Sequence, residues 1–173
     1  LVRYIYSQGH RRIAYIHGQQ NGSAVTKDRL TSFYRTMDEL KLEVPDEYIR
    51  TAGYLETREA AKQTKELLNL ENPPTCIIYP DDTSLIGGRN VIIEMGLRIP
   101  RDISVAGYDG TMISQLLYPK LTTIRQNTEM IGSEAATRLI GTIEKPRTTL
   151  VERVVIEGSL VPGQSVGAIQ PKG

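Results

Sequence analysis

Cysteine is almost absent from this sequence. The 173 residues contain one, Cys76, which excludes an internal disulfide framework and any zinc site built from several cysteines. Cys76 lies in the apolar run of residues 76–79, where a free cysteine packs as a small hydrophobic side chain. We therefore expect a buried structural thiol.

An excess of charge and a long apolar run are also missing. Lysine and arginine total 21 against 20 acidic residues, a net charge of +1, and Arg11-Arg12 is the only adjacent basic pair. A domain that binds nucleic acid by itself concentrates its basic side chains on one surface, so we do not expect this chain alone to grip DNA. No segment approaches the roughly 18 apolar residues of a membrane span, and we expect no membrane partner.

Common catalytic and phosphate-binding motifs are missing as well. Neither a Gly-x-x-x-x-Gly-Lys-Ser/Thr loop nor a Gly-x-Gly-x-x-Gly fingerprint after a strand occurs, which leaves nucleotide chemistry unsupported. Residues 163–167 fit the Gly-x-Ser-x-Gly pattern of hydrolases around Ser165. That pattern needs a later acid and histidine, and neither follows. We interpret the match as chance and expect neither an enzyme nor a cofactor.

Histidines and paired acids offer only weak metal sites. His10 and His17 flank one predicted strand but lack a matching third ligand. Asp81 and Asp82 could hold a hard cation through oxygen atoms. We favour Asp82 as the cap of the following helix, while Asp81 stays open between structure and ligand contact. We predict no metal site.

Short β-branched runs alternate with longer amphipathic runs, as in repeated strand–helix units. Gly9 and Gly96 stand where a helix can end in the left-handed conformation. The apolar strands indicate a parallel sheet covered by helices on both faces, a doubly wound α/β fold. Strands are expected at residues 12–16, 48–51, 75–79, 103–106 and 150–156, and helices at 1–7, 25–40, 55–68, 84–95 and 127–143.

Ligands of such folds bind beyond the carboxyl ends of the strands. This rule selects the chain from Gly18 onward, residues 79–82 and residues 107–109. Two of these three places carry carboxylates. The architecture therefore predicts an acidic binding edge.

Three stretches resemble motifs of the lactose-repressor (LacI/GalR) family of sensor domains. Residues 9–14, Gly-His-Arg-Arg-Ile-Ala, are similar to the Gly-His-Arg-x-Ile-Ala signature that opens the family's second lobe. Residues 96–109 resemble Gly-Leu-x-Ile/Val-Pro-x-Asp-Ile-Ser-Val-x-Gly-Phe/Tyr-Asp, and residues 119–126 resemble the Pro-x-Leu-Thr-Thr-Ile/Val block. Order and spacing match from residue 1 to about 165, and the three motifs together are specific.

The resemblance implies a lobe of a two-lobed, periplasmic-binding-protein-like type I fold. The implied function is the effector-sensing and dimerisation domain of a cytoplasmic transcriptional repressor that responds to a sugar-like small molecule. Operator DNA would be bound by a helix-turn-helix domain that lies outside the match. Most of the N-terminal lobe also lies outside the match. Residues 1–125 and 145–165 correspond to the C-terminal lobe, 126–144 to a segment of the N-terminal lobe, and 166–173 to a flexible tail.

That division has a consequence for the helix at 127–143. Ile131, Ala135 and Leu139 fall on one helical face and would lose the cover that the N-terminal lobe gives them. We expect this helix to be mobile, swapped or packed on a neighbouring chain.

The resemblance also implies the ligand-binding residues. Arg29 matches an arginine that holds effector oxygens, and its guanidinium can form paired hydrogen bonds to hydroxyls or a carboxylate. Asp109 matches an effector-contacting aspartate. Asp81 stands where the family often has asparagine, and Tyr54 at a position that can stack on a sugar face. Gln126 and Asn127, near the crossover between the lobes, are weaker candidates.

The resemblance implies a homodimer as well. The helix from Ser84 to Met95 and the loop from Met112 to Tyr118 correspond to family dimerisation surfaces. Leu116, Leu117 and Tyr118 are too apolar to be left exposed. A periplasmic sugar-binding protein of an ABC-type transporter remains the alternative function.

Overall fold

Among the residues that the structure describes, six strands form one sheet in the order β2-β1-β3-β4-β5-β6. The computed structural model describes residues 1–19, 23–145 and 152–169. The first five strands are parallel, and β6 pairs antiparallel with β5. The strands are β1 (Ile13–His17), β2 (Ile49–Thr51), β3 (Cys76–Ile78), β4 (Ser104–Asp109), β5 (Thr122–Arg125) and β6 (Ser159–Val161).

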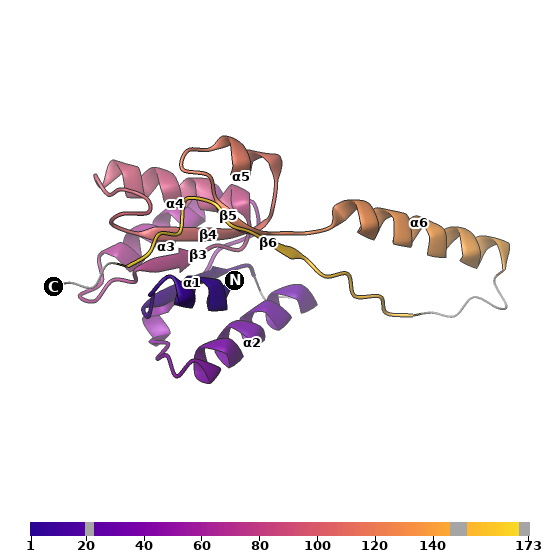
Figure 1. Ribbon diagram of the computed structural model, residues 1–173, viewed down its shortest axis with the longest axis horizontal. Helices are drawn as coiled ribbons and strands as arrows, with labels where there is room; N and C mark the ends of the chain where they lie inside the picture. Colours follow the sequence, from indigo (N-terminus) through magenta and orange to yellow (C-terminus); the bar gives the residue numbers. More distant parts are fainter. Residues whose placement is uncertain (20–22, 146–151, 170–173) are drawn as a thin grey trace.

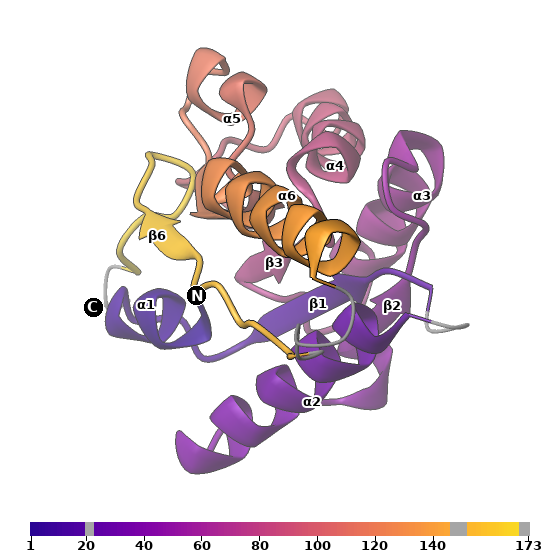
Figure 2. The same ribbon diagram turned by 90° about the vertical axis from the view of Figure 1, so that its right-hand side faces the viewer.

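Helices cover both faces of this sheet (Figures 1 and 2). Helices α1 and α2 lie on one face, and α3 and α4 lie on the other. This arrangement confirms the doubly wound α/β fold. The helices are α1 (Val2–Ser7), α2 (Ala24–Glu39), α3 (Thr57–Leu68), α4 (Asp82–Glu94), α5 (Met112–Leu116) and α6 (Thr128–Glu144), with a 3-10 turn at Asp46–Tyr48.

Strand β1 shows how the sequence builds two cores. All five of its residues are buried. Ile13 and Tyr15 belong to the cluster under α1 and α2, while Ala14 and Ile16 belong to the cluster under α3 and α4. Side chains of a strand alternate between faces, so a strand buried on both faces is apolar throughout. Cys76 is fully buried in the first cluster, which confirms the structural thiol.

Glycines allow the closest helix contact. A Cβ on Gly87 of α4 would lie 1.9 Å from the carbonyl oxygen of Thr57, which begins α3. Only a residue without a side chain permits this approach. Gly9 and Gly96 adopt φ of +92° and +75°, which confirms their predicted places after helices.

One predicted strand is wrong, and two strands, β5 and β6, were missed. The described part of the strand expected at 150–156 is extended chain without a strand partner, and Val154 and Val155 are exposed. Strand propensity reflects packing on a sheet, and this segment lies away from the sheet (Figure 1). The motif at 119–126 contains β5, which the sequence analysis did not identify as a strand.

Helix α6 and the segment 152–158 form an arm that projects from the sheet (Figure 1). The two parts lie along each other, and Arg138 Nη1 donates to Glu152 Oε2 at 3.0 Å. None of the helix residues is buried, as the exposed side chains of Ile131 and Leu139 illustrate. Residues 152–158 therefore accompany α6, although the sequence placed them with the main lobe.

The chain after residue 165 returns to the main body. Val166 is buried, and the Gly167 N–H donates to Ser104 Oγ at 3.1 Å. The Ile169 N–H donates to the Gln8 carbonyl at 2.8 Å. The packed structure therefore continues through Ile169, beyond the start of the expected tail at 166. Within the described ranges, no helix is long and apolar enough to cross a membrane.

Candidate functional site

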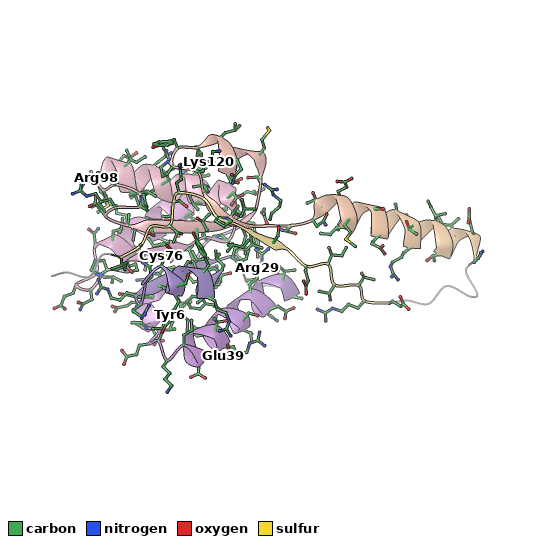
Figure 3. The ribbon with its side chains drawn as sticks, viewed as in Figure 1. Tyr6, Arg29, Glu39, Cys76, Arg98 and Lys120 are labelled. Carbon is green, nitrogen blue, oxygen red and sulfur yellow. The ribbon has the colours of Figure 1, made fainter. Side chains whose placement is uncertain are left out.

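The strand order places a crevice at the carboxyl ends of β1 and β3. Successive connections leave these neighbouring strands in opposite directions, because β2 lies on one side and β4 on the other. Ligands of doubly wound sheets bind at such a switch point. Arg29 reaches this edge from α2 (Figure 3).

Three contacts fix the Arg29 guanidinium. Its Nη1 donates to the Pro80 carbonyl at 3.1 Å, just past the end of β3. Its Cζ lies 4.3 Å from the centre of the Tyr108 ring, a cation–π contact. Its Nη2 lies 3.9 Å from Asp109 Oδ1, which is too long for a hydrogen bond. The two opposite charges are therefore close but retain donors and acceptors for a ligand.

Asp109 ends β4 in an unusual backbone conformation. Its φ is +97°, in a region that residues with a side chain rarely adopt. Gln126 Nε2 donates to Asp109 Oδ1 at 2.5 Å, and the Gln126 backbone N–H donates to the Asp109 carbonyl at 3.2 Å. Asp109 and Gln126 thus lie together, and each keeps polar atoms at the carboxyl edge of the sheet.

A hollow of about 210 Å³ adjoins this group. Arg29 and Gln126 supply polar atoms to its wall. Asn127, the other weaker candidate, also lines it and caps α6 by accepting from the Met130 N–H at 3.1 Å. The remaining lining residues are Tyr108, Ile124, Ile131, Ile156 and Gly158. Since Ile131 and Ile156 belong to the arm, the hollow lies where the main body meets the arm.

Tyr54 lies on a separate part of the same edge. Its hydroxyl shares a hydrogen bond of 2.9 Å with Thr26 Oγ1. Its ring covers Gly18, where an added Cβ would be 2.5 Å from the ring. The residue keeps 39% of its surface exposed, so part of Tyr54 remains accessible to a ligand. Among the described residues, Tyr54 forms no hydrogen bond with Arg29 or Asp109; its hydrogen-bond partner is Thr26.

Asp81, and not Asp82, caps the helix that follows the two aspartates. Asp81 caps α4 by accepting from the Ser84 N–H at 2.7 Å and from its hydroxyl at 2.8 Å. Its other contact is the Leu55 N–H at 3.0 Å. The expectation that Asp82 caps the helix is wrong, because its carboxylate points instead to Thr111 and Thr123. Both aspartates are buried, so Asp81 offers a ligand almost no surface.

Both histidines have hydrogen-bond partners within the fold. His10 Nδ1 lies 2.9 Å from Thr75 Oγ1 and its Nε2 lies 3.0 Å from the Gly167 carbonyl. His17 is likewise buried and lies 2.6 Å from the Gly18 carbonyl. The described residues contain no group of three metal ligands.

The hydrolase-like match is structural. Ser165 is fully buried, donates to the Val105 carbonyl at 2.6 Å and accepts from the Thr122 N–H at 2.8 Å. A nucleophile must face a substrate, and this hydroxyl is enclosed by two backbone groups.

Exposed apolar side chains lie along α4 and α5, and Ile93 and Tyr118 line one hollow on this surface. Leu116 and Tyr118 are exposed on the single chain, although we expected them to be too apolar for that, whereas Leu117 packs against the core cluster below. Leu117 therefore already has a partner within the chain, and only Leu116 and Tyr118 remain for a contact between subunits. The exposed members are Ile93, Met95, Met112, Ile113, Leu116 and Tyr118.

Comparison with known proteins agrees with this geometry. A model of the periplasmic binding protein-like domain matches residues 2–166. The probable HTH-type transcriptional repressor ExuR of Bacillus subtilis (strain 168) is 32% identical over 147 residues, which are 85% of this chain and 44% of the relative. The chain thus spans less than half the length of this relative.

Solved structures give the same result. A putative transcriptional regulator LacI from Bacillus cereus subsp. cytotoxis NVH 391-98 superposes with a TM-score of 0.90 at 27% identity, over 97% of this chain and 58% of that chain. The transcriptional regulator CelR in complex with cellobiose superposes with a TM-score of 0.86 at 26% identity, over 94% of this chain and 49% of that chain.

Fold and site together define a lobe of the periplasmic-binding-protein type. The chain belongs to the periplasmic binding protein-like domain family. Its relatives are LacI-family transcriptional regulators, which confirms the resemblance found in the sequence. They also favour the regulator over the transport protein that the sequence left as the alternative.

Proposed function

We propose that this chain is the effector-sensing and dimerisation part of a cytoplasmic transcriptional repressor, and that Arg29 and Asp109 hold its ligand. One observation carries the proposal: an arginine and an aspartate from different elements meet at the carboxyl edge with a separation of 3.9 Å. Neither charge is fully used by the other. A ligand with adjacent donors and acceptors can bind both.

The chemistry of this pair favours a polyhydroxylated ligand. A guanidinium presents planar paired donors, and an ionised carboxylate accepts from hydroxyl groups. Tyr108 lines the hollow beside Arg29, and the partly exposed Tyr54 follows β2. The relative CelR was solved with cellobiose. We therefore propose a sugar or sugar derivative as the effector.

The arm is proposed to complete the pocket with a second lobe. Helix α6 has no buried residue, and a groove of about 500 Å³ lies between it and residues 152–156. An exposed apolar face of this kind requires a covering partner. In this proposal α6 and residues 152–158 belong to the N-terminal lobe, and ligand binding changes how that lobe sits on the main body. Operator DNA would be bound by a separate domain.

The apolar surface on α4 and α5 is proposed as the homodimer interface. A two-fold interface joins the same patch on both subunits, so one self-complementary apolar patch is sufficient. The exposed side chains of Leu116 and Tyr118 supply its centre.

Ligand titration of variants tests the proposal. Saturation-transfer NMR would measure binding of cellobiose, galacturonate, glucose 6-phosphate and hypoxanthine to this chain. With half of the pocket present, we expect at best a dissociation constant of about 1 mM, worth roughly 4 kcal/mol. Arg29→Lys and Asp109→Asn should each abolish the saturation-transfer signal of whichever of these four compounds binds the parent chain.

A control arginine separates charge from position. Arg98 pairs with Asp102 at 2.8 Å, at an end of the molecule far from Arg29 (Figure 3). Arg98→Lys should leave binding unchanged. Equal losses in Arg29→Lys and Arg98→Lys, or micromolar affinity that survives Arg29→Lys, would contradict the proposed site.

A further inference from the structure

Asp82 is a fully buried carboxylate that no proposed ligand contact uses. It belongs to the first turn of α4 and has no exposed surface. Its Oδ2 accepts from the Thr111 N–H at 2.8 Å and from the Thr111 hydroxyl at 3.0 Å. Its Oδ1 accepts from the Thr123 hydroxyl at 2.7 Å. Three donors from two other elements therefore converge on one carboxylate.

These donors enclose the turn that carries Asp109. Thr111 is the last residue of this turn. Thr123 Oγ1, which donates to Asp82, also accepts from the Gly110 N–H at 3.2 Å. Asp109 and Gly110 have φ of +97° and +65°, two successive residues in the left-handed half of conformational space. Such a conformation persists in a residue with a side chain only when its surroundings hold it in place.

The fit of Asp82 against β4 is close. A Cβ on Gly107 would lie 2.6 Å from Asp82 Oδ1, so only glycine leaves room for the carboxylate there. Burial raises the pKa of Asp82, while the hydrogen bonds from Thr123 and Thr111 lower it. The neighbour Asp81 holds a different loop, through the Leu55 N–H. The two adjacent carboxylates thus brace two different walls of the binding edge.

We infer that Asp82 is a positioning residue that holds the Asp109–Thr111 turn and thereby aims the Asp109 carboxylate at Arg29 and Gln126. Its importance for the ligand rests on the proposed function. Its effect on the turn does not, so the test needs no ligand.

Amide hydrogen exchange by NMR on this chain tests the inference. Asp82→Asn keeps the size of the side chain but removes the charge that strengthens three hydrogen bonds. Exchange of the Thr111 and Gly110 amides should accelerate about tenfold, because one net hydrogen bond is worth about that factor. The side-chain amide signal of Gln126 should also shift, because Asp109 Oδ1 accepts from it.

Asp81→Asn is the matched control. It should accelerate exchange at Leu55 and Ser84 and leave Gly110, Thr111 and the Gln126 side chain unchanged. If Asp82→Asn and Asp81→Asn accelerated amide exchange equally in both loops, Asp82 would have only a general structural role and the inference would be wrong. Unchanged exchange at Gly110 and Thr111 in Asp82→Asn would overturn the inference.

A milder variant keeps the test open if Asp82→Asn does not fold. Thr123→Val removes the acceptor of the Gly110 N–H and one donor to Asp82. Faster exchange at Gly110 and a shifted Gln126 side chain are expected, while no change at either would also overturn the inference. Ligand titration is a separate experiment: a shifted turn together with ligand binding that Arg29→Lys and Arg98→Lys weaken equally would contradict the proposed function alone.

Discussion

Gly87 offers a sharp test of how the helices on one face pack. Replacement by alanine adds a Cβ 1.9 Å from the Thr57 carbonyl oxygen and 2.9 Å from the Thr57 Cα. Ordinary contact begins near 3.4 Å, so α3 and α4 must separate by roughly 1.5 Å. The atoms in the way belong to the backbone, and both helices also pack on the sheet, so neither can shift cheaply.

The magnitude follows from two opposing effects. Overpacking in a packed interior costs about 1–3 kcal/mol. Alanine in a helix interior is more favourable than glycine by about 1 kcal/mol. Because the clash is with rigid backbone, the upper end of the overpacking range applies, and we expect a net loss of about 2 kcal/mol for Gly87→Ala. That is a large part of the roughly 5–15 kcal/mol by which domains are stable.

The same substitution in α6 is the control. A Cβ on Gly132 would meet nothing within 4 Å. Gly132→Ala should therefore leave the urea midpoint unchanged or raise it, by up to about 1 kcal/mol of helix propensity. Urea denaturation followed by circular dichroism measures both variants. A Gly87→Ala protein as stable as the parent chain would refute the close contact between α3 and α4.

Three further substitutions test burial, the hydrolase-like motif and the dimer. Burial lowers the pKa of His10 below 6.5, so the unfolded chain takes up the proton first and stability should fall as pH drops below about 6.5. Urea midpoints at pH 7.5 and 5.5 should show this fall, and His10→Gln should reduce it. Ser165→Ala should cost about 1–3 kcal/mol in urea denaturation, because it leaves a buried backbone donor and acceptor unpaired, and an unchanged midpoint would be evidence against this role. Leu116→Glu should convert a dimer to a monomer in sedimentation velocity, whereas a dimer that persists would place the interface elsewhere.

The sequence predicted the main body well because its signals are local and periodic. Apolar runs marked β1 and β3, and Gly9 and Gly96 marked helix ends through their backbone freedom. The prediction for residues 150–156 fails over its described part, residues 152–156, because β-branched residues favour a strand even where they do not pair with a sheet. Strand β5 lies inside the motif at residues 119–126, which was assigned by family resemblance alone, so its β-branched residues were not interpreted as a strand.

The site was partly predictable for a similar reason. Arg29 and Asp109 were found by motif, and the structure brings them within 3.9 Å of one another. The division of labour between Asp81 and Asp82 was not predictable, because adjacent residues at a strand end can point to either side. Only the positions of Leu55 and Thr111 in three dimensions decide which carboxylate braces which loop.

The central claim is that Arg29 and Asp109 hold the effector. Its most direct test is a map of the backbone and side-chain NMR shifts that change when the compound found to bind in the saturation-transfer experiment is added. The account predicts that the shifts concentrate at Arg29, Tyr108–Gly110 and Gln126, and that they vanish in Arg29→Lys but persist in Arg98→Lys. Shifts centred elsewhere, or the same map in Arg29→Lys, would contradict the claim that this edge binds the effector.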